Sequence, residues 1–371
     1  MCIRDRVWPL VIAALLCIIA WFLLRHWQVP WYIFLAAFVP VAALIRKPKI
    51  VTVTAGIFSL LATVGIVNME YQTYPDIASL DPRPVAKEMS YEEFSHTKSG
   101  AAIVHVDLPG TTSHFAARQA TAYIPPAYWT DHTLPVIVLL HGNPGGPDQW
   151  FGSGEAAETA DQFQAANGGR SPIVIAVDAT GSETANPICA DSSQAKVMTY
   201  LSQDVPQAIK QKFKVNPDQR TWTVGGLSYG GTCSLQIATN RPEAYGSIID
   251  ISGEAEPTIG NHAATVKKFF AGDESAFNDQ DPAHLLAHKH FSTQAIFIAG
   301  DKDTASVNAL RSLSDAARAA GMKTYFGTRP GGHSFQVCPA LRESFAWAAS
   351  RGGMTAIKDP FDGIGAVSYT H

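Results

Sequence analysis

Ser228 has the sequence surroundings of a nucleophile. It lies at the centre of GGLSYGG, residues 225–231, which separates a short apolar run from a helical pattern. Glycines two residues before and after a serine are typical of a sharp strand-to-helix turn that exposes the hydroxyl above a sheet. The pattern predicts acyl transfer, in which Ser228 attacks an ester carbonyl. A plain glycine-rich loop is the alternative.

A serine hydroxyl needs a base, and His333 has a suitable position for one. It lies in RPGGHSF, between the last predicted strand and the last predicted helix. An acid must hold the imidazole in the correct tautomer. We predict Asp303 for this role, because the loop must carry the carboxylate away from the strand tip towards His333. Asp301 and Asp250 are the alternatives, and an aspartate in either place can instead cap a helix or hold a loop.

Two backbone N–H groups are needed to stabilise the oxyanion of the reaction. Tyr229, directly after the serine, is expected to supply one. Asn143 is expected to supply the other, from the loop HGNPGG at residues 141–146, since Pro144 has no N–H. A phosphate-binding loop would need Gly-Lys-Ser/Thr after these glycines, and that sequence is absent. His141 is expected to support this loop rather than to react.

The elements that must position these residues alternate along the chain. Short apolar runs and helical patterns in alternation are typical of βαβ units, so we predict an α/β fold with a mostly parallel sheet and helices on both faces. Ligands bind such sheets beyond the carboxyl ends of the strands, where every motif above falls. The predicted strands cover 101–106, 119–124, 135–140, 172–177, 221–224, 246–251, 294–299 and 323–326. The predicted helices cover 155–166, 200–213, 229–239, 306–320 and 335–348.

Residues 100–350 resemble the putative-esterase branch of the α/β-hydrolases, which includes esterase D-like enzymes and mycobacterial mycolyltransferases. The resemblance implies the α/β-hydrolase fold, no metal or organic cofactor, and catalytic roles for Ser228, Asp303 and His333. Membrane-anchored actinobacterial members are the most similar overall. The matching features are His141-Gly142 with Trp150-Phe151 downstream, the Gly226–Gly230 turn, Gly300-x-x-Asp303 and Gly332-His333-Ser334-Phe335.

Several other polar and aromatic residues have two interpretations. Trp150 and Phe151 can line a substrate pocket or pack in the core. Asp178 and Asp191 can contact substrate, but turn chemistry is favoured for both. Three nearby histidines suggest a metal site, yet no further ligand accompanies them and a solvated helix face is favoured. These histidines are His284, His288 and His290.

The five cysteines predict one disulfide. Cys189 and Cys233 can both lie near the site, and their bridge would attach a loop to the helix that follows Ser228. An extracytoplasmic domain permits such a bond. Cys338 is expected to be buried in the last helix.

The first 70 residues predict a membrane anchor. Apolar runs at 7–24, 31–45 and 50–67 are close to the roughly 17–25 residues that cross a bilayer as a helix. A single cleaved signal peptide is the alternative. The basic loop Arg46-Lys47-Pro48-Lys49 should stay cytoplasmic, which places the later residues outside the cytoplasm.

Beyond the anchor, we predict a linker at 71–100, the hydrolase domain at 101–350 and a tail at 351–371. The opening MCIRDR and the closing VSYTH resemble translated sequencing-adapter sequence, so both termini are expected to be truncated. The number of membrane helices therefore stays open.

The function favoured by these residues is hydrolysis of a carboxylic ester of a small molecule or a lipid. An acyltransferase with a sugar or lipid hydroxyl as acceptor would use the same triad. A catalytically inactive cell-wall module and a peptidase are weaker alternatives. The 28 basic and 32 acidic residues give a net charge of −4, which offers no electrostatic case for nucleic acid binding. The oligomeric state stays open.

Overall fold

The computed structural model describes residues 3–24, 31–45, 50–71, 86–333, 337–354 and 357–359. The chain divides into two units, Met1–Asp81 and Pro82–His371. The basic loop 46–49, residues 72–85 of the predicted linker and most of the predicted tail lie outside the described residues, as does Cys2, and the side chain of Cys338 is not described.

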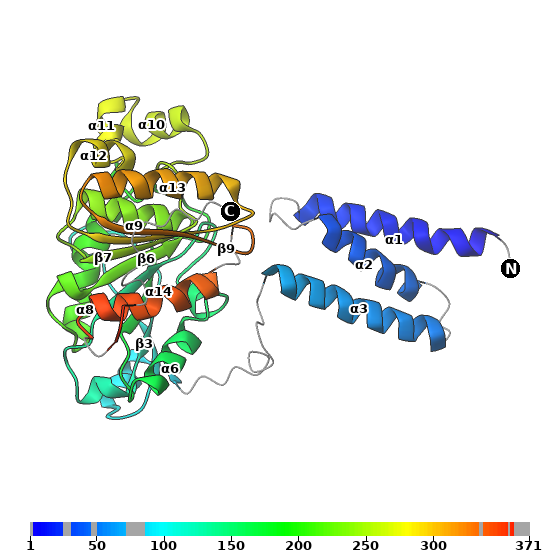
Figure 1. The fold of residues 1–371 in the computed structure, drawn as a ribbon, viewed down its shortest axis with the longest axis horizontal. Coiled ribbons are helices and arrows are strands. Elements are labelled where there is room, and N and C mark those ends of the chain that lie inside the picture. The colour runs from blue at the N-terminus through cyan, green and yellow to red at the C-terminus, as the bar shows by residue number, and fades with distance from the viewer. Residues whose placement is uncertain are drawn as a thin grey trace. The chain divides into compact units, whose positions relative to one another are not determined.

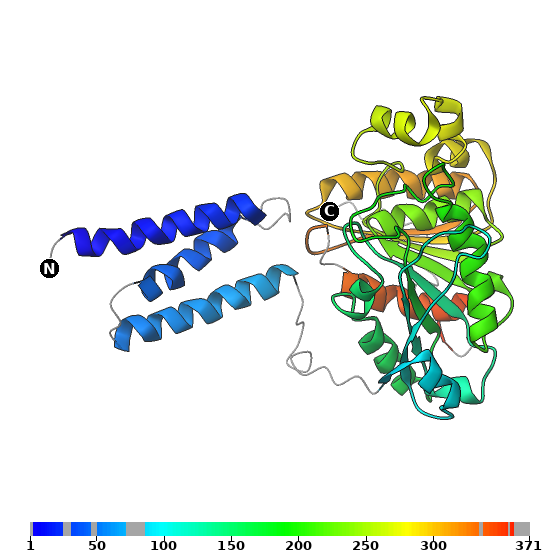
Figure 2. The same ribbon diagram turned by 180° about the vertical axis from the view of Figure 1, so that it is seen from behind.

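The first unit consists of three helices, α1 (Ile3–Leu24), α2 (Trp31–Ile45) and α3 (Ile50–Tyr71), and α2 packs against both of the others (Figures 1 and 2). The helices therefore form where the apolar runs predicted them. Within the described residues, no helix combines the length and the apolarity that crossing a membrane requires. The three predicted spans thus have no support from the structure. The 15 residues of α2 extend only about 22 Å, short of a hydrocarbon core of roughly 30 Å.

The second unit is built on one mixed sheet. In its described part the strand order is β1-β2-β3-β5-β4-β6-β7-β8-β9. The strands that follow β3 in this order, from β5 through β4 and β6 to β9, are all parallel to their neighbours. Strand β3 is antiparallel to both β2 and β5. The strands are β1 (Lys87–Ser90), β2 (Ala102–Val106), β3 (Ala120–Ile124), β4 (Val136–Leu140), β5 (Ile173–Val177), β6 (Thr223–Leu227), β7 (Ser247–Ile251), β8 (Gln294–Gly300) and β9 (Lys323–Arg329).

Helices cover both faces of this sheet, as the sequence predicted. Figure 1 shows α9 and α13 on one face and α6 and α14 on the other. Strand β4 explains the arrangement, because Val136, Val138 and Leu140 join one apolar core while Ile137 and Leu139 join the other. The helices are α4 (Tyr91–His96), α5 (Asp148–Phe151), α6 (Ala156–Ala166), α7 (Val197–Thr199), α8 (Val205–Lys212), α9 (Tyr229–Asn240), α10 (His262–Phe270), α11 (Glu274–Asn278), α12 (Pro282–His288), α13 (Thr304–Ala319) and α14 (Val337–Arg351).

The structure differs from the sequence prediction in two regions. The predicted linker 71–100 contains β1 and α4, so the folded part of the second unit begins earlier than the domain boundary predicted at residue 101. Ser90 and Glu93 form a capping box at the start of α4, a signal that the sequence carries as S-x-x-E. Between β7 and β8, α10 and α11 were not predicted, and α12 was expected only as a helix face carrying His284 and His288. Each begins at an Asn or Asp cap, namely Asn261, Asp273 and Asp281.

Candidate active site

The turn between β6 and α9 holds Ser228 in a strained backbone conformation. Its φ of 56° and ψ of −115° lie in a region that residues with a side chain rarely adopt. The flanking glycines are required by close packing. A Cβ on Gly226 would lie 2.3 Å from the carbonyl carbon of Gly230, and one on Gly230 would lie 2.2 Å from the carbonyl oxygen of Leu140. The Ser228 N–H donates to Ile251 O at 2.8 Å, which fixes the turn against β7.

Three side chains that the sequence singled out meet at this turn. His333 Nε2 lies 2.8 Å from Ser228 Oγ, and His333 Nδ1 lies 2.6 Å from Asp303 Oδ2. The residues follow β6, β8 and β9, whose carboxyl ends share one edge of the sheet. A histidine between a serine and a carboxylate can take the serine proton through Nε2 while the carboxylate holds Nδ1–H. The arrangement is therefore competent for nucleophilic catalysis.

Asp303 is positioned and ionised so that it can stabilise a protonated imidazole. Its Oδ1 accepts a hydrogen bond from the Ser306 N–H, so it also caps α13. Burial alone would raise the pKa of Asp303, but hydrogen bonds from His333 and Ser306 lower it below its ordinary value. The carboxylate is thus ionised at neutral pH, as an imidazolium partner requires.

The two alternative acids have other partners. Asp301 Oδ1 accepts from the Gly331 N–H at 3.0 Å, which ties the loop of His333 to the end of β8. Asp250 is fully buried, accepts from the Gly253 N–H at 3.0 Å, and its Oδ2 has no partner among the described residues. Burial raises the pKa of Asp250 to about 8, so it is mainly neutral at pH 7.

The two predicted oxyanion donors come from the turn itself and from the loop after β4. The N–H of Tyr229 is at the start of α9, where helix N–H groups have no intrahelical partner. Asn143 belongs to the β4 loop (residues 141–147), and its N–H has no hydrogen bond in the part of the chain that the structure describes. The loop runs beside the turn, since a Cβ on Gly142 would lie 3.6 Å from Leu227 O.

A disulfide joins Cys189 and Cys233, the pair that the sequence analysis expected to be bridged. It connects the loop after β5 to the first turns of α9. The Tyr229 hydroxyl strengthens the same junction, because it accepts from the Cys189 N–H at 2.9 Å and donates to Ala179 O at 3.0 Å. This loop is therefore fixed to the helix that begins after Ser228.

The aromatic pair proposed for the substrate pocket has mainly a packing role. Trp150 is 1% exposed, and its Nε1–H donates to Leu140 O at 2.9 Å, at the end of β4. A side chain this buried cannot line an open pocket, so the pocket prediction for Trp150 is wrong. Phe151 is half-buried and packs against the same core.

The remaining candidates have local roles. The rings of His284 and His288 stack with centroids 4.3 Å apart, and His290 Nδ1 lies 3.3 Å from Ala320 O. Among the described residues, no cluster of three or more His, Cys, Asp or Glu side chains could hold a metal ion. Asp191 accepts from the N–H and the hydroxyl of Thr199.

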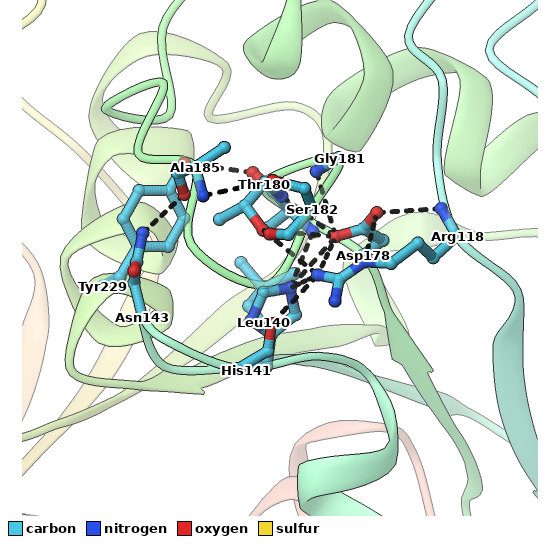
Figure 3. Close-up of polar contacts among 12 residues, drawn as sticks. Arg118, Leu140, His141, Asn143, Asp178, Thr180, Gly181, Ser182, Ala185 and Tyr229 are labelled. Carbon is cyan, nitrogen blue, oxygen red and sulfur yellow. Dashed lines mark hydrogen bonds and ion pairs between the residues drawn. The ribbon is translucent and has the colours of Figure 1, made fainter.

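Asp178 belongs to an ionic cluster, with its carboxylate buried, that the sequence did not reveal. Arg118, which no motif marked, pairs with it at 2.8 Å, and His141 Nε2 lies 3.1 Å from the same carboxylate (Figure 3). Both aspartate and histidine are fully buried. Arg118 comes from the segment before β3, so only the fold brings these charges together.

Known proteins resemble this chain in sequence and in fold. The model of the family described as "Putative esterase" matches residues 116–350. An uncharacterized protein of Corynebacterium glutamicum is 50% identical over 353 residues, which cover 88% of this chain and 83% of that protein.

Two solved structures share the fold. A ferulic acid esterase superposes with a TM-score of 0.58 at 17% identity, covering 68% of this chain and 98% of its own. An S-formylglutathione hydrolase from Agrobacterium tumefaciens gives a TM-score of 0.57 at 17% identity, covering 68% of this chain and 96% of its own.

Proposed function

The chain belongs to the putative esterase family and is an enzyme of the serine hydrolase type, and we propose that it hydrolyses a carboxylic ester through an acyl-enzyme on Ser228. The observation that carries this proposal is the chain of contacts from Ser228 Oγ through His333 to Asp303, at 2.8 and 2.6 Å. These distances suit proton transfer between a nucleophile and its base.

In the proposed reaction, Ser228 Oγ attacks the carbonyl carbon while its proton passes to His333 Nε2. The oxyanion of the tetrahedral intermediate accepts hydrogen bonds from the N–H groups of Asn143 and Tyr229. When the intermediate collapses, His333 returns the proton to the leaving alcohol, and the acyl group stays on Ser228. Water then attacks the acyl-enzyme with His333 as its base and releases the acid.

Reaction with a labelled fluorophosphonate and turnover of p-nitrophenyl esters test the nucleophile. Ser228→Ala should abolish labelling and lower kcat by on the order of 10⁴ or more. Ser95→Ala, at an exposed serine on α4 whose hydroxyl donates to Glu92 O, should behave as the wild type. Ester turnover unchanged in Ser228→Ala would contradict the proposal.

The acyl and alcohol parts of the substrate need a separate experiment. A panel of esters of increasing acyl length bounds the acyl pocket. Adding a sugar or a lipid alcohol as acceptor tests for transferase activity, because an acyltransferase would divert the acyl-enzyme from water to that hydroxyl. Release of free acid alone would leave hydrolysis as the reaction.

We further propose that the hydrolase unit works outside the cytoplasm, attached to a membrane through the first unit. The Cys189–Cys233 disulfide supports an oxidising compartment. The large hydrophobic side chains that are exposed in the described part of the chain all lie on α1, α2 and α3, for example Trp8, Leu35 and Phe58. Exposed apolar patches mark surfaces that bind a membrane or a protein partner.

Cell fractionation tests this location. The full chain should sediment with membranes, and an external protease should digest the hydrolase unit in cells whose wall has been removed. Recovery of the chain in the soluble cytoplasmic fraction would contradict both parts of the proposal.

A further inference from the structure

Asp178 is a buried carboxylate with an unusual number of donors. Its oxygens accept hydrogen bonds from the Arg118 backbone N–H at 2.8 Å and from Arg118 Nε and Nη2 at 3.1 and 2.8 Å. The N–H groups of Thr180 and Gly181 add bonds of 3.0 and 3.2 Å (Figure 3). Burial alone would raise the pKa of Asp178, but the bonds from His141 and Arg118 hold it below its ordinary value.

Such a cluster is poorly explained by stability alone. Removing charges from water is costly, and apolar residues of similar size often stabilise a protein as well as a buried ion pair does. The cluster lies at the carboxyl end of β5, next to the β4 loop. Arg118 Nη2 also donates to Gly145 O at 3.0 Å, so the same guanidinium contacts both Asp178 and the β4 loop.

His141 transmits this arrangement to the loop backbone. Its Nδ1 lies 2.7 Å from Gly142 O, and a carbonyl oxygen only accepts, so Nδ1 carries a proton. Its Nε2 lies 3.2 Å from the Ala179 N, 3.3 Å from Arg118 Nη2 and 3.1 Å from Asp178 Oδ1. Whether Nε2 accepts from these donors or donates to the carboxylate, Nδ1–H still points to Gly142 O.

The position of Gly142 O determines where the next N–H points. Gly142 C=O and Asn143 N–H belong to one trans peptide, the cis bond being the following one to Pro144, so the two groups point in opposite directions. Gly142 N–H is held by Gln149 Oε1 at 2.9 Å, and the Asn143 side chain donates to Ala185 O at 2.5 Å. With these groups occupied, the Asn143 N–H is fixed and has no partner in the described part of the chain.

We propose that Arg118 and His141, held by Asp178, are positioning residues that orient the Asn143 N–H as an oxyanion donor. The proposal rests on the function proposed above for Ser228. A donor aimed before the reaction starts stabilises the transition state without reorganisation, and it contributes little to binding of the ground state. Loss of the orientation should therefore lower kcat and leave KM nearly unchanged.

Two substitutions of one residue provide a matched test. His141→Asn places an amide N–H near the position of Nδ1 and can keep the bond to Gly142 O, whereas His141→Gln places its amide near Nε2 and loses that bond. We expect kcat for a p-nitrophenyl ester to fall about 10- to 100-fold in His141→Gln, approaching the loss of one oxyanion donor, and much less in His141→Asn.

A thionoester with the same leaving group separates orientation from general damage. Sulfur is a weak hydrogen-bond acceptor, so the wild type should prefer the oxygen ester strongly. In His141→Gln this preference should shrink, because the contribution of the N–H is already lost. A loosened structure would instead slow both substrates equally and leave the preference unchanged.

Arg118→Lys serves as the second variant if His141→Gln does not fold. Lysine keeps the charge but lacks the planar fork that contacts Asp178 and Gly145 together, so the same loss of kcat and of oxygen preference is expected. Arg170→Lys is the control, because it alters a more exposed ion pair with Asp131 at 3.0 Å that no described site residue contacts. That variant should behave as the wild type.

The outcomes distinguish the two proposals. If Ser228→Ala retains full turnover, the proposed function fails. If Ser228 is required but His141→Gln, or Arg118→Lys in its place, keeps wild-type kcat and oxygen preference, only the orientation proposal is overturned. Equal losses for both esters would also overturn it.

Discussion

Asp303 uses its two carboxylate oxygens for different partners. Oδ2 lies 2.6 Å from His333 Nδ1, and Oδ1 accepts from the Ser306 N–H at the start of α13. The helix therefore fixes the direction of the carboxylate, and the carboxylate fixes the imidazole. Asp301, two residues earlier, holds the backbone at Gly331 instead.

Comparison of two isosteric variants should separate these roles. Asp303→Asn can still bond to the histidine but favours the wrong tautomer, so kcat should fall by on the order of 10³ to 10⁴ with little change in KM. Asp301 accepts from the Gly331 N–H, so Asp301→Asn should lower kcat far less. Steady-state kinetics on one ester give kcat and KM for both variants. Equal losses of kcat in the two variants would contradict the choice of Asp303 over Asp301 as the acid.

At the candidate site, the sequence alone pointed to the residues that lie in local motifs. Ser228 and His333 each stand in a short glycine-rich segment, and Asp303 follows a clear strand, so chain order and strand ends were enough to predict that these three side chains meet. Arg118 could not be found in this way. Its partners are 23 and 60 residues away along the chain, and nothing near it signals a buried charge.

At the scale of elements, the crossing of α9 and β4 leaves no room for a side chain. A Cβ on Gly230 would lie 2.2 Å from Leu140 O and 2.8 Å from His141 O, both of them backbone atoms that cannot rotate away. The turn that exposes Ser228 and the start of the β4 loop are thus packed directly on each other. Helix, strand and loop must shift together if this contact is altered.

Gly230→Ala should therefore destabilise the hydrolase unit strongly. Overpacking in a rigid core costs about 1–3 kcal/mol or more, and backbone contact places this site at the upper end. Gly332→Ala offers a control in the loop of His333, since a Cβ there meets nothing within 4 Å. Urea unfolding measures the free energy of unfolding of both variants. If Gly230→Ala were as stable as Gly332→Ala, the turn would be able to shift and accommodate the extra methyl group, which would contradict the prediction.

The disulfide links two elements that carry different parts of the site. It closes a loop between residues 44 positions apart, for which chain entropy predicts a stabilisation of about 4 kcal/mol. A reducing agent should lower the Tm of the wild type. A Cys189→Ala/Cys233→Ala double variant should have this lower Tm without the reducing agent, and its Tm should not fall further when the agent is added. If the agent lowered the Tm of both proteins equally, the stabilisation would not come from this disulfide.

Element prediction failed where the local signals were short. The apolar strands β4 to β8 and the helices α9 and α13 stand out by periodicity, and the structure has all of them. Strand β1 has four residues, with Met89 as its one buried side chain, so its pattern is indistinguishable from a linker. The helices α10 to α12 are five to nine residues long, and their caps are the clearest sign of them.

At the scale of the whole molecule, Asp250 makes stability depend on pH. It lies between α9 and the loop after β7, since a Cβ on either Gly231 or Gly253 would come within 2.3 Å of its Oδ1. Its pKa rises from an ordinary 3.8 to about 8 because it is buried. Between these two values the folded state holds a proton that the unfolded state has lost, so this group's contribution to stability falls as the pH rises.

Asp250→Asn should remove that dependence. The amide keeps an acceptor for the Gly253 N–H and has no proton to lose, so the variant should gain stability relative to the wild type from about pH 4 to pH 8. Asp279→Asn, at an exposed carboxylate, should follow the wild-type profile. Urea unfolding at several pH values tests this, and parallel profiles for Asp250→Asn and the wild type would contradict it.

The contact between His333 and Ser228 spans 105 residues of chain, across strands that are all parallel. At a synthesis rate of about 5–20 residues per second, residue 333 follows residue 228 by about 5–20 s. During that interval the nascent chain already contains Ser228 but not His333, the base proposed to activate it. The order of the strands thus delays assembly of the proposed triad until residue 333 has been made.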